Sequence, residues 1–126
     1  MGKRILVVDD SRTIRSSVKY TLEKEGYEVI LAKDGKDGLA KLEENSSMSE
    51  RPKMIITDVN MPNMDGITFV QEVKKSSKFK FIPALILTTE SQASMKEKGK
   101  KAGAAGWLVK PFKPEQLLKV AKKFIR

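Results

Sequence analysis

Acidic side chains that could bind a divalent cation follow two of the apolar runs in this chain. Asp9 and Asp10 follow residues 5–8, and Asp58 comes shortly after residues 54–56. If these runs are neighbouring parallel strands, the carboxylates meet at the edge of the sheet where open α/β folds bind ligands. Two unit charges about 5 Å apart repel by roughly 3 kcal/mol at an effective dielectric near 20. Three such groups therefore require a cation.

The chain offers this cation only oxygen ligands, because it contains neither histidine nor cysteine. Oxygen ligands indicate a hard ion, and an open site that keeps its waters suits Mg²⁺ better than a Ca²⁺ cage. Taken singly, an aspartate is more commonly a helix cap or a turn residue. Three aspartates at adjacent strand ends favour the metal interpretation.

Two further runs end in groups suited to a phosphoryl oxygen. Lys110 follows residues 107–109 and carries a positive charge on a long stem, and Thr88 follows residues 84–87 with a hydroxyl donor. Alone, Lys110 would be an ordinary surface lysine and Thr88 an ordinary strand residue. With a nearby carboxylate nucleophile and a metal, they predict a phosphoryl-transfer site in which electrostatic positioning does most of the work.

The elements that must position these groups are five short apolar runs, each followed by a segment with helical periodicity. The runs comprise residues 5–8, 29–31, 54–56, 84–87 and 107–109. Continuous apolar character is typical of parallel strands buried on both faces. We therefore predict an α/β fold, a doubly wound five-stranded parallel sheet with five helices and right-handed crossovers. In the flavodoxin-like strand order 2-1-3-4-5, the first and third strands are neighbours.

The fourth helix, expected at roughly residues 92–102, is the weakest of the five. It has little apolar stripe and contains Gly99, which costs about 1 kcal/mol relative to alanine. Such a helix should shift easily. That softness is as compatible with simple tolerance at the surface as with a functional role.

Composition excludes several classes of protein. We expect one domain spanning residues 1–126, because this length can bury a core without disulfides or structural metals. The absence of cysteine and histidine excludes a thiol nucleophile, a zinc site and a phosphohistidine carrier. No segment reads as a signal peptide or a membrane span, so we expect a cytoplasmic protein without membrane insertion.

A net charge of +9 could indicate a nucleic-acid binder. The basic residues are scattered and no DNA- or RNA-binding motif occurs, so lysine-rich helix faces are the better interpretation and no specific nucleic acid is expected. No P-loop motif is present. A phosphatase that forms an aspartyl-phosphate would usually carry a second acid two positions after its nucleophile, where this chain has Asn60.

Four segments resemble the signature segments of response-regulator receiver domains, specifically those of single-domain CheY-type chemotaxis regulators. They are residues 7–11 (VVDDS), 57–66 (TDVNMPNMDG), 87–90 (LTTE) and 109–112 (VKPF). The similarity covers essentially the whole chain, with the segments in order and at appropriate spacing. Because this family has the flavodoxin-like strand order, that order is not independent of the resemblance.

The resemblance implies that Asp58 accepts a phosphoryl group from the phosphohistidine of a sensor histidine kinase. It implies that Asp10, Asp58 and the backbone carbonyl of Asn60 bind Mg²⁺, with Asp9 assisting through water. Lys110 and Thr88 would then hold the phosphoryl oxygens. By the same analogy the Lys110-Pro111 peptide bond is expected to be cis.

The resemblance also implies a switch and an output. Trp107 occupies the family's switch-aromatic position, where tyrosine or phenylalanine is commoner, and a core tryptophan is the alternative interpretation. Thr89 stands where the family often has alanine. Asn60 and Glu90 lie two positions beyond the acceptor and the switch threonine, where side chains would tune hydrolysis of the phosphoryl group.

The expected function is a monomeric, phosphorylation-controlled binding module that phosphorylates and dephosphorylates itself weakly with Mg²⁺. Its expected partners are a chemotaxis-type kinase and a flagellar motor switch protein or acidic peptide, with a phosphatase as a further candidate. A phosphate sink or phosphorelay intermediate is the alternative. The expected partner surface, unless it is merely a solvated basic face, comprises Trp107 and the lysines of the fourth and fifth helices: Lys96, Lys98, Lys100, Lys101, Lys119, Lys122 and Lys123.

Overall fold

The computed structural model describes residues 3–89 and 93–125 and contains the predicted alternation of strands and helices. The strands are β1 (Arg4–Val8), β2 (Glu28–Ala32), β3 (Met54–Asp58), β4 (Ala84–Thr88) and β5 (Gly106–Val109). The helices are α1 (Arg12–Lys24), α2 (Gly35–Glu44), α3 (Gly66–Lys75), α4 (Ala93–Ala102) and α5 (Pro114–Phe124). All strand pairs are parallel and their order is β2-β1-β3-β4-β5, which confirms the flavodoxin-like fold.

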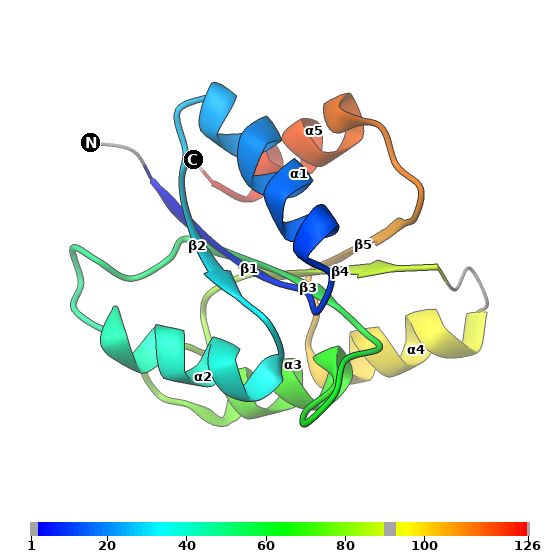
Figure 1. The fold of residues 1–126 in the computed structure, drawn as a ribbon. Coiled ribbons are helices and arrows are strands. Elements are labelled where there is room, and N and C mark those ends of the chain that lie inside the picture. Colours follow the sequence, from blue (N-terminus) through cyan, green and yellow to red (C-terminus); the bar gives the residue numbers. More distant parts are fainter. Residues whose placement is uncertain (1–2, 90–92, 126) are drawn as a thin grey trace.

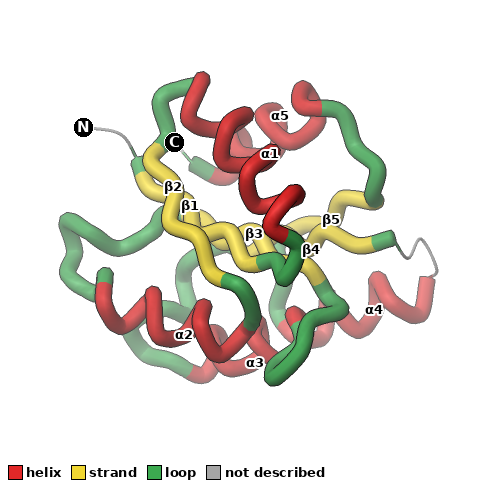
Figure 2. The backbone as a smooth tube through the Cα atoms, in the orientation of Figure 1, coloured by secondary structure: helices red, strands yellow, loops and turns green. Residues whose placement is uncertain are grey.

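The sheet forms a central layer between two layers of helices (Figures 1 and 2). Helices α1 and α5 cover one face, and α2, α3 and α4 cover the other. Alternate residues of a strand point to opposite faces, so β1 contributes Ile5 and Val7 to one core and Leu6 and Val8 to the other. This burial on both faces explains why the strands read as continuous apolar runs.

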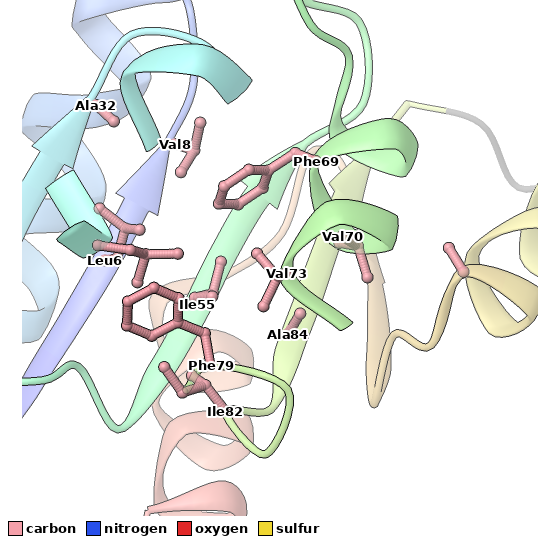
Figure 3. Packing of buried hydrophobic residues seen from close by; sticks show 12 residues of the cluster. Leu6, Val8, Ala32, Ile55, Phe69, Val70, Val73, Phe79, Ile82 and Ala84 are labelled. Atoms are coloured by element: carbon pink, nitrogen blue, oxygen red, sulfur yellow. The ribbon is translucent and has the colours of Figure 1, made fainter. Parts of the chain in front are cut away.

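The core beneath α2 and α3 is built around a fully buried phenylalanine. Phe69 of α3 packs in the same cluster as Leu6 and Val8 of β1 and Val73 of its own helix (Figure 3). Its ring also lies where a side chain on Gly38 of α2 would stand, with the nearest ring carbon at 2.8 Å from the position of such a Cβ. The absence of a side chain at Gly38 therefore lets α2 pack closely beside α3.

The glycine that weakens α4 has a packing reason. Gly99 is buried, and a Cβ atom at this position would stand 2.9 Å from Ile86 Cδ1 and 3.2 Å from Trp107 Cζ3. The missing side chain thus lets α4 lie directly against the indole ring of β5. The sequence indicated only the cost in helix propensity, whereas the structure shows what the small residue permits.

Candidate functional site

The three predicted carboxylates meet at the carboxyl edge of the sheet. Val8 of β1 pairs with Thr57 of β3, so the residues that come directly after this pair emerge side by side. Asp9, Asp10 and Asp58 each place one carboxylate oxygen within 4.8 Å of the others. This is the geometry that a single divalent cation requires, and the all-oxygen donor set fits Mg²⁺.

Asp9 is almost completely buried and uses both of its carboxylate oxygens. Its Oδ1 accepts a hydrogen bond from the Ser11 backbone N–H at 2.9 Å, and its Oδ2 accepts one from Lys110 Nζ at 3.2 Å. Asp10, by contrast, is exposed. This difference in exposure agrees with the expected roles, in which Asp10 binds a cation directly and Asp9 assists through water.

Asp58 lies at the end of β3 with its side chain 13% exposed. Its Oδ1 accepts a hydrogen bond from the Val59 backbone N–H at 2.8 Å and lies 3.3 Å from Lys110 Nζ. Within residues 3–89 and 93–125, no group is seen to donate a hydrogen bond to Oδ2. Burial, and then the negative charge of Asp9, raise the pKa of the Asp58 carboxyl above its ordinary value, although Lys110 opposes them.

Lys110 bridges Asp9 and Asp58, so it is a site residue and not an ordinary surface lysine. Its side chain is only 15% exposed. The Lys110 backbone N–H donates to the Thr88 carbonyl at 2.7 Å, which ties the end of β5 to the end of β4. Thr88 itself is buried. The peptide bond between Lys110 and Pro111 is cis, as expected.

Other residues cap the helices that follow the acidic strand ends. The N-cap of α1 is Ser11, whose hydroxyl accepts from the Ile14 N–H at 3.3 Å. The N-cap of α3 is Asp65, which accepts from the Thr68 N–H at 2.8 Å. The capping alternative therefore does not account for the three clustered aspartates.

Gly66 is a site residue whose role the sequence did not reveal. A Cβ atom at this position would collide with the carbonyl oxygen of Asp58, and the Gly66 N–H donates to the Val59 carbonyl at 2.9 Å. The start of α3 can therefore close against the end of β3 only without a side chain here. Asn60 lies in the loop between them and is exposed.

Trp107 lies half-buried on β5, opposite Ile86 of β4. Its indole N–H is buried and meets no acceptor in the part of the chain that the structure describes. A cavity of about 250 Å³ beside the ring is lined by Lys96 and Lys100 of α4. The predicted switch residue Trp107 and two of the predicted partner lysines therefore border the same cavity.

The predicted partner lysines differ in their surroundings. Lys98 lines a different cavity, of about 330 Å³, together with Asn60 of the β3–α3 loop. Lys122 of α5 lies 3.9 Å from Glu25 and is partly neutralised. Helices α4 and α5 lie on opposite faces of the sheet, with β5 at the edge between them (Figure 1). The remaining predicted lysines are all exposed, namely Lys101, Lys119 and Lys123.

Glu90, which we expected to tune hydrolysis, lies outside the described residues. In the described part of the chain, no helix has the length and apolar character needed to cross a bilayer.

Comparison with known proteins gives concordant matches. The family described as the response regulator receiver domain matches residues 5–122. The chemotaxis protein CheY1 of Helicobacter pylori is 42% identical over 115 residues, which cover 90% of both chains. The crystal structure of the chemotaxis protein CheY4 of Vibrio cholerae superposes with a TM-score of 0.91 at 47% identity, covering 99% of this chain and all of that one.

A third similar structure bears on the metal. The receiver domain of a sensor histidine kinase from Pseudomonas aeruginosa has a TM-score of 0.85 and 26% identity, covering 99% of this chain and 98% of that one. It is described as having a magnesium ion coordinated in its active-site cleft.

Proposed function

Because the chain belongs to the response regulator receiver family, we propose that it is a phosphorylation-activated switch of a chemotaxis two-component system. In this proposal Asp58 accepts a phosphoryl group from the phosphohistidine of a sensor kinase, and the phosphorylated protein binds a partner. The observation that carries the proposal is the position of Asp58 beside Lys110 within a cluster of three carboxylates. Receiver domains of this kind are switch modules and not classical enzymes.

Phosphoryl transfer would use Asp58 Oδ2, which accepts no hydrogen bond from the described residues, whereas Oδ1 is held by the Val59 N–H and Lys110. Asp58 Oδ2 would attack phosphorus, and the P–N bond of the donor would break with its electron pair left on the imidazole. Oδ1 stays bound to the Val59 N–H at 2.8 Å, which orients the carboxylate for the attack. The raised pKa of Asp58 reflects an anion that burial and Asp9 disfavour, so the positive charge of Lys110 helps to keep the attacking carboxylate ionised.

Magnesium would be held by carboxylates of Asp10 and Asp58 and by the backbone carbonyl of Asn60, with Asp9 behind them. When bound, it neutralises the carboxylate cluster and the charge that develops on the phosphoryl oxygens. The chain's own contribution is to position the oxygens. The burial of Asp9 and the exposure of Asp10 support this assignment of roles.

Lys110 and Thr88 would bind the phosphoryl oxygens once Asp58 is phosphorylated. Lys110 Nζ already lies 3.3 Å from Asp58 Oδ1, so a small movement would carry its charge to the phosphoryl group. The phosphoryl group carries about 1.5 to 2 negative charges where the carboxylate carried one, and this added charge attracts the lysine and the threonine hydroxyl. Movement of Thr88 would shift the end of β4 and the segment that leads into α4.

Trp107 is well placed to report and transmit this movement. Its buried indole N–H lacks an acceptor among the described residues, and an unsatisfied buried donor costs about 1 to 3 kcal/mol. A second conformation that gives the N–H a partner would recover that free energy. Allosteric couplings of this kind are typically about 1 to 3 kcal/mol, which changes partner affinity several-fold to a hundredfold.

The proposed partner is an acidic segment of a flagellar motor switch protein, bound at the face formed by α4, β5 and α5. The exposed lysines of α4 and α5 supply charge complementarity, and the Trp107 cavity bordered by Lys96 and Lys100 supplies an apolar anchor point. Asn60 and Glu90 would set the rate of hydrolysis. We expect the protein to act as a cytoplasmic monomer that a dedicated phosphatase can reset.

Intact-mass measurement tests the acceptor. The protein is incubated with Mg²⁺ and acetyl phosphate, and we expect one added phosphoryl group in the wild type and none in Asp58→Asn. Asp65→Asn is the matched control, because it changes an aspartate in the same region while asparagine still caps α3. Equal labelling of Asp58→Asn and the wild type would refute the assignment.

Binding of an acidic peptide from a motor switch protein separates a motor output from a phosphate sink. Beryllofluoride-activated protein should bind the peptide more tightly than unmodified protein, and more weakly as salt rises. Equal affinity in the two states would favour the sink or relay alternative.

A further inference from the structure

The loop that carries Asn60 is anchored from outside the site by a carboxylate on another element. Asp34 is the N-cap of α2, and it is only 3% exposed. Its Oδ2 accepts a hydrogen bond from Asn63 Nδ2 at 2.8 Å, across 29 positions of sequence. The loop between β3 and α3 is thus fastened beside the start of α2 (Figure 1).

Asp34 performs two tasks with its two oxygens. While Oδ2 binds Asn63, Oδ1 accepts the Asp37 backbone N–H at 2.8 Å and closes the first turn of α2. These two hydrogen bonds lower the pKa of the Asp34 carboxyl, the bond from Asp37 contributing more. The first turn of α2 therefore helps to fix the Asp34 carboxylate, whose other oxygen binds the β3–α3 loop.

The anchored loop has an unusual backbone at the point of contact. Asn63 has φ +67°, and the Met64 N–H donates to the Pro62 carbonyl at 2.7 Å across it, as in a γ-turn. Residues other than glycine adopt this region at a cost, and γ-turns with positive φ are rare. Such a conformation persists when its surroundings hold it in place.

A second contact joins the same two loops. The Gly35 N–H donates to the Met64 carbonyl at 3.2 Å. A Cβ atom at Gly35 would stand 2.6 Å from Met64 Cγ and 2.9 Å from the Met64 carbonyl oxygen, so close approach requires glycine. The Asp34–Asn63 and Gly35–Met64 contacts therefore fix the middle of the loop, while the Gly66 contact with Val59 fixes its end.

We propose that Asp34 is a positioning residue for phosphoryl transfer, which acts through Asn63 to hold the β3–α3 loop and the Asn60 carbonyl at the site. Asp34 does not touch the reacting atoms. The inference rests on the proposed function, because it gives Asp34 a role in building the cation and phosphoryl site around Asp58. Partners that orient the groups around a metal typically affect its affinity by about 10- to 100-fold.

Two single variants and their combination test this inference. Asp34→Ser keeps a side-chain acceptor that can cap α2 but is too short to reach Asn63. Asn63→Gly removes the other half of the contact, and glycine adopts positive φ without strain. Asp37→Ala is the matched control, because it removes a hydrogen bond from the Lys33 N–H within the β2–α2 region without touching the β3–α3 loop.

Mg²⁺ affinity is measured by calorimetric titration, and amide hydrogen exchange of residues 59–65 is measured without metal. We expect a Mg²⁺ dissociation constant about tenfold higher in Asp34→Ser and in Asn63→Gly, together with faster exchange in the loop. The double variant should bind Mg²⁺ no more weakly than the weaker-binding single variant, because both substitutions remove the same Asp34–Asn63 contact. Asp37→Ala should match the wild type in both measurements.

The inference is overturned if either single variant binds Mg²⁺ like the wild type, or if the effects of the two variants add. If Asp34→Ser fails to fold, Asn63→Gly alone decides, since it leaves the cap of α2 intact. Failure of the proposed function is a separate result, because the wild-type protein itself would then neither bind Mg²⁺ nor accept a phosphoryl group.

Discussion

Replacing Asp58 with asparagine should stabilise the metal-free protein at neutral pH, although it removes the proposed phosphoryl acceptor. The amide keeps the shape of the side chain and its acceptor for the Val59 N–H. It removes a charge that lies within 4.8 Å of carboxylate oxygens of Asp9 and Asp10. At that separation each pair of charges repels by about 3 kcal/mol at an effective dielectric near 20.

The loss of the ion pair between Asp58 and Lys110 opposes this stabilisation. At 3.3 Å this pair attracts by about 5 kcal/mol on the same scale. The exposure of Asp10 screens part of its repulsion, so the Coulomb terms nearly cancel and the burial of the Asp58 carboxylate decides the sign. We expect a net stabilisation of about 1 kcal/mol, which corresponds to a rise in Tm of about 3 to 6 °C for a domain of this size.

The pH dependence gives this prediction its sharpest test. The pKa of Asp58 is raised in the folded state, so folding tolerates the protonated acid and is penalised by the anion. The penalty is absent below the ordinary carboxyl pKa of 3.8 and develops as pH rises through the higher folded-state value. The stability advantage of Asp58→Asn should therefore be small near pH 3.5 and full at pH 7.

Mg²⁺ should reverse the difference. At ten times its dissociation constant, the ion stabilises the wild type by about 1.4 kcal/mol, and it should stabilise Asp58→Asn much less because one ligand is lost. The assay is urea unfolding at pH 3.5 and pH 7, with and without the metal. An Asp58→Asn protein that is less stable than the wild type at pH 7 without Mg²⁺ would refute this account of the site's electrostatics.

Four further substitutions test other parts of the protein. Lys110→Ala should still bind Mg²⁺ in calorimetry, while acetyl phosphate labelling or beryllofluoride activation falls about tenfold or more. A grossly unfolded variant with normal residual chemistry would instead show that Lys110 serves the fold. Gly99→Ala should lower the free energy of unfolding by about 1 kcal/mol and shift the fluorescence emission of Trp107, because overpacking against the indole outweighs the gain in helix propensity. A more stable Gly99→Ala protein would show that α4 moves away from the indole without cost. Asn60→Lys and Glu90→Lys should change the decay rate of the phosphorylated protein without abolishing labelling, and unchanged decay in both would discard their role in hydrolysis.

Much of the site was predictable because a parallel sheet collects the ends of its strands. Asp9 and Asp10 follow β1 and Asp58 ends the neighbouring β3, so their convergence follows from local sequence once the strand order is known. The apolar runs specify the strands, since strands buried on both faces must be apolar throughout. The strand order came from a family resemblance and not from the periodicity of the residues.

Only the tertiary structure decided how residues that lie close together in sequence differ in burial and in contacts. Asp9 and Asp10 are adjacent in sequence, yet only Asp9 is buried and paired with Lys110. Lys98 and Lys100 are two positions apart on α4, yet they border different cavities. How deeply a side chain is buried, and which cavity it borders, depend on the residues that pack against it. Residue type does not carry that information.

Contacts between distant segments were equally hidden in the sequence. Asp34 reads as a helix cap and Asn63 as a turn residue, and each is satisfied locally by that interpretation. Only the folded chain brings the β2–α2 and β3–α3 loops close enough for the 2.8 Å hydrogen bond between them. Local sequence thus determined the elements and the chemical groups at their ends, while packing between elements determined which of those groups hold one another in place.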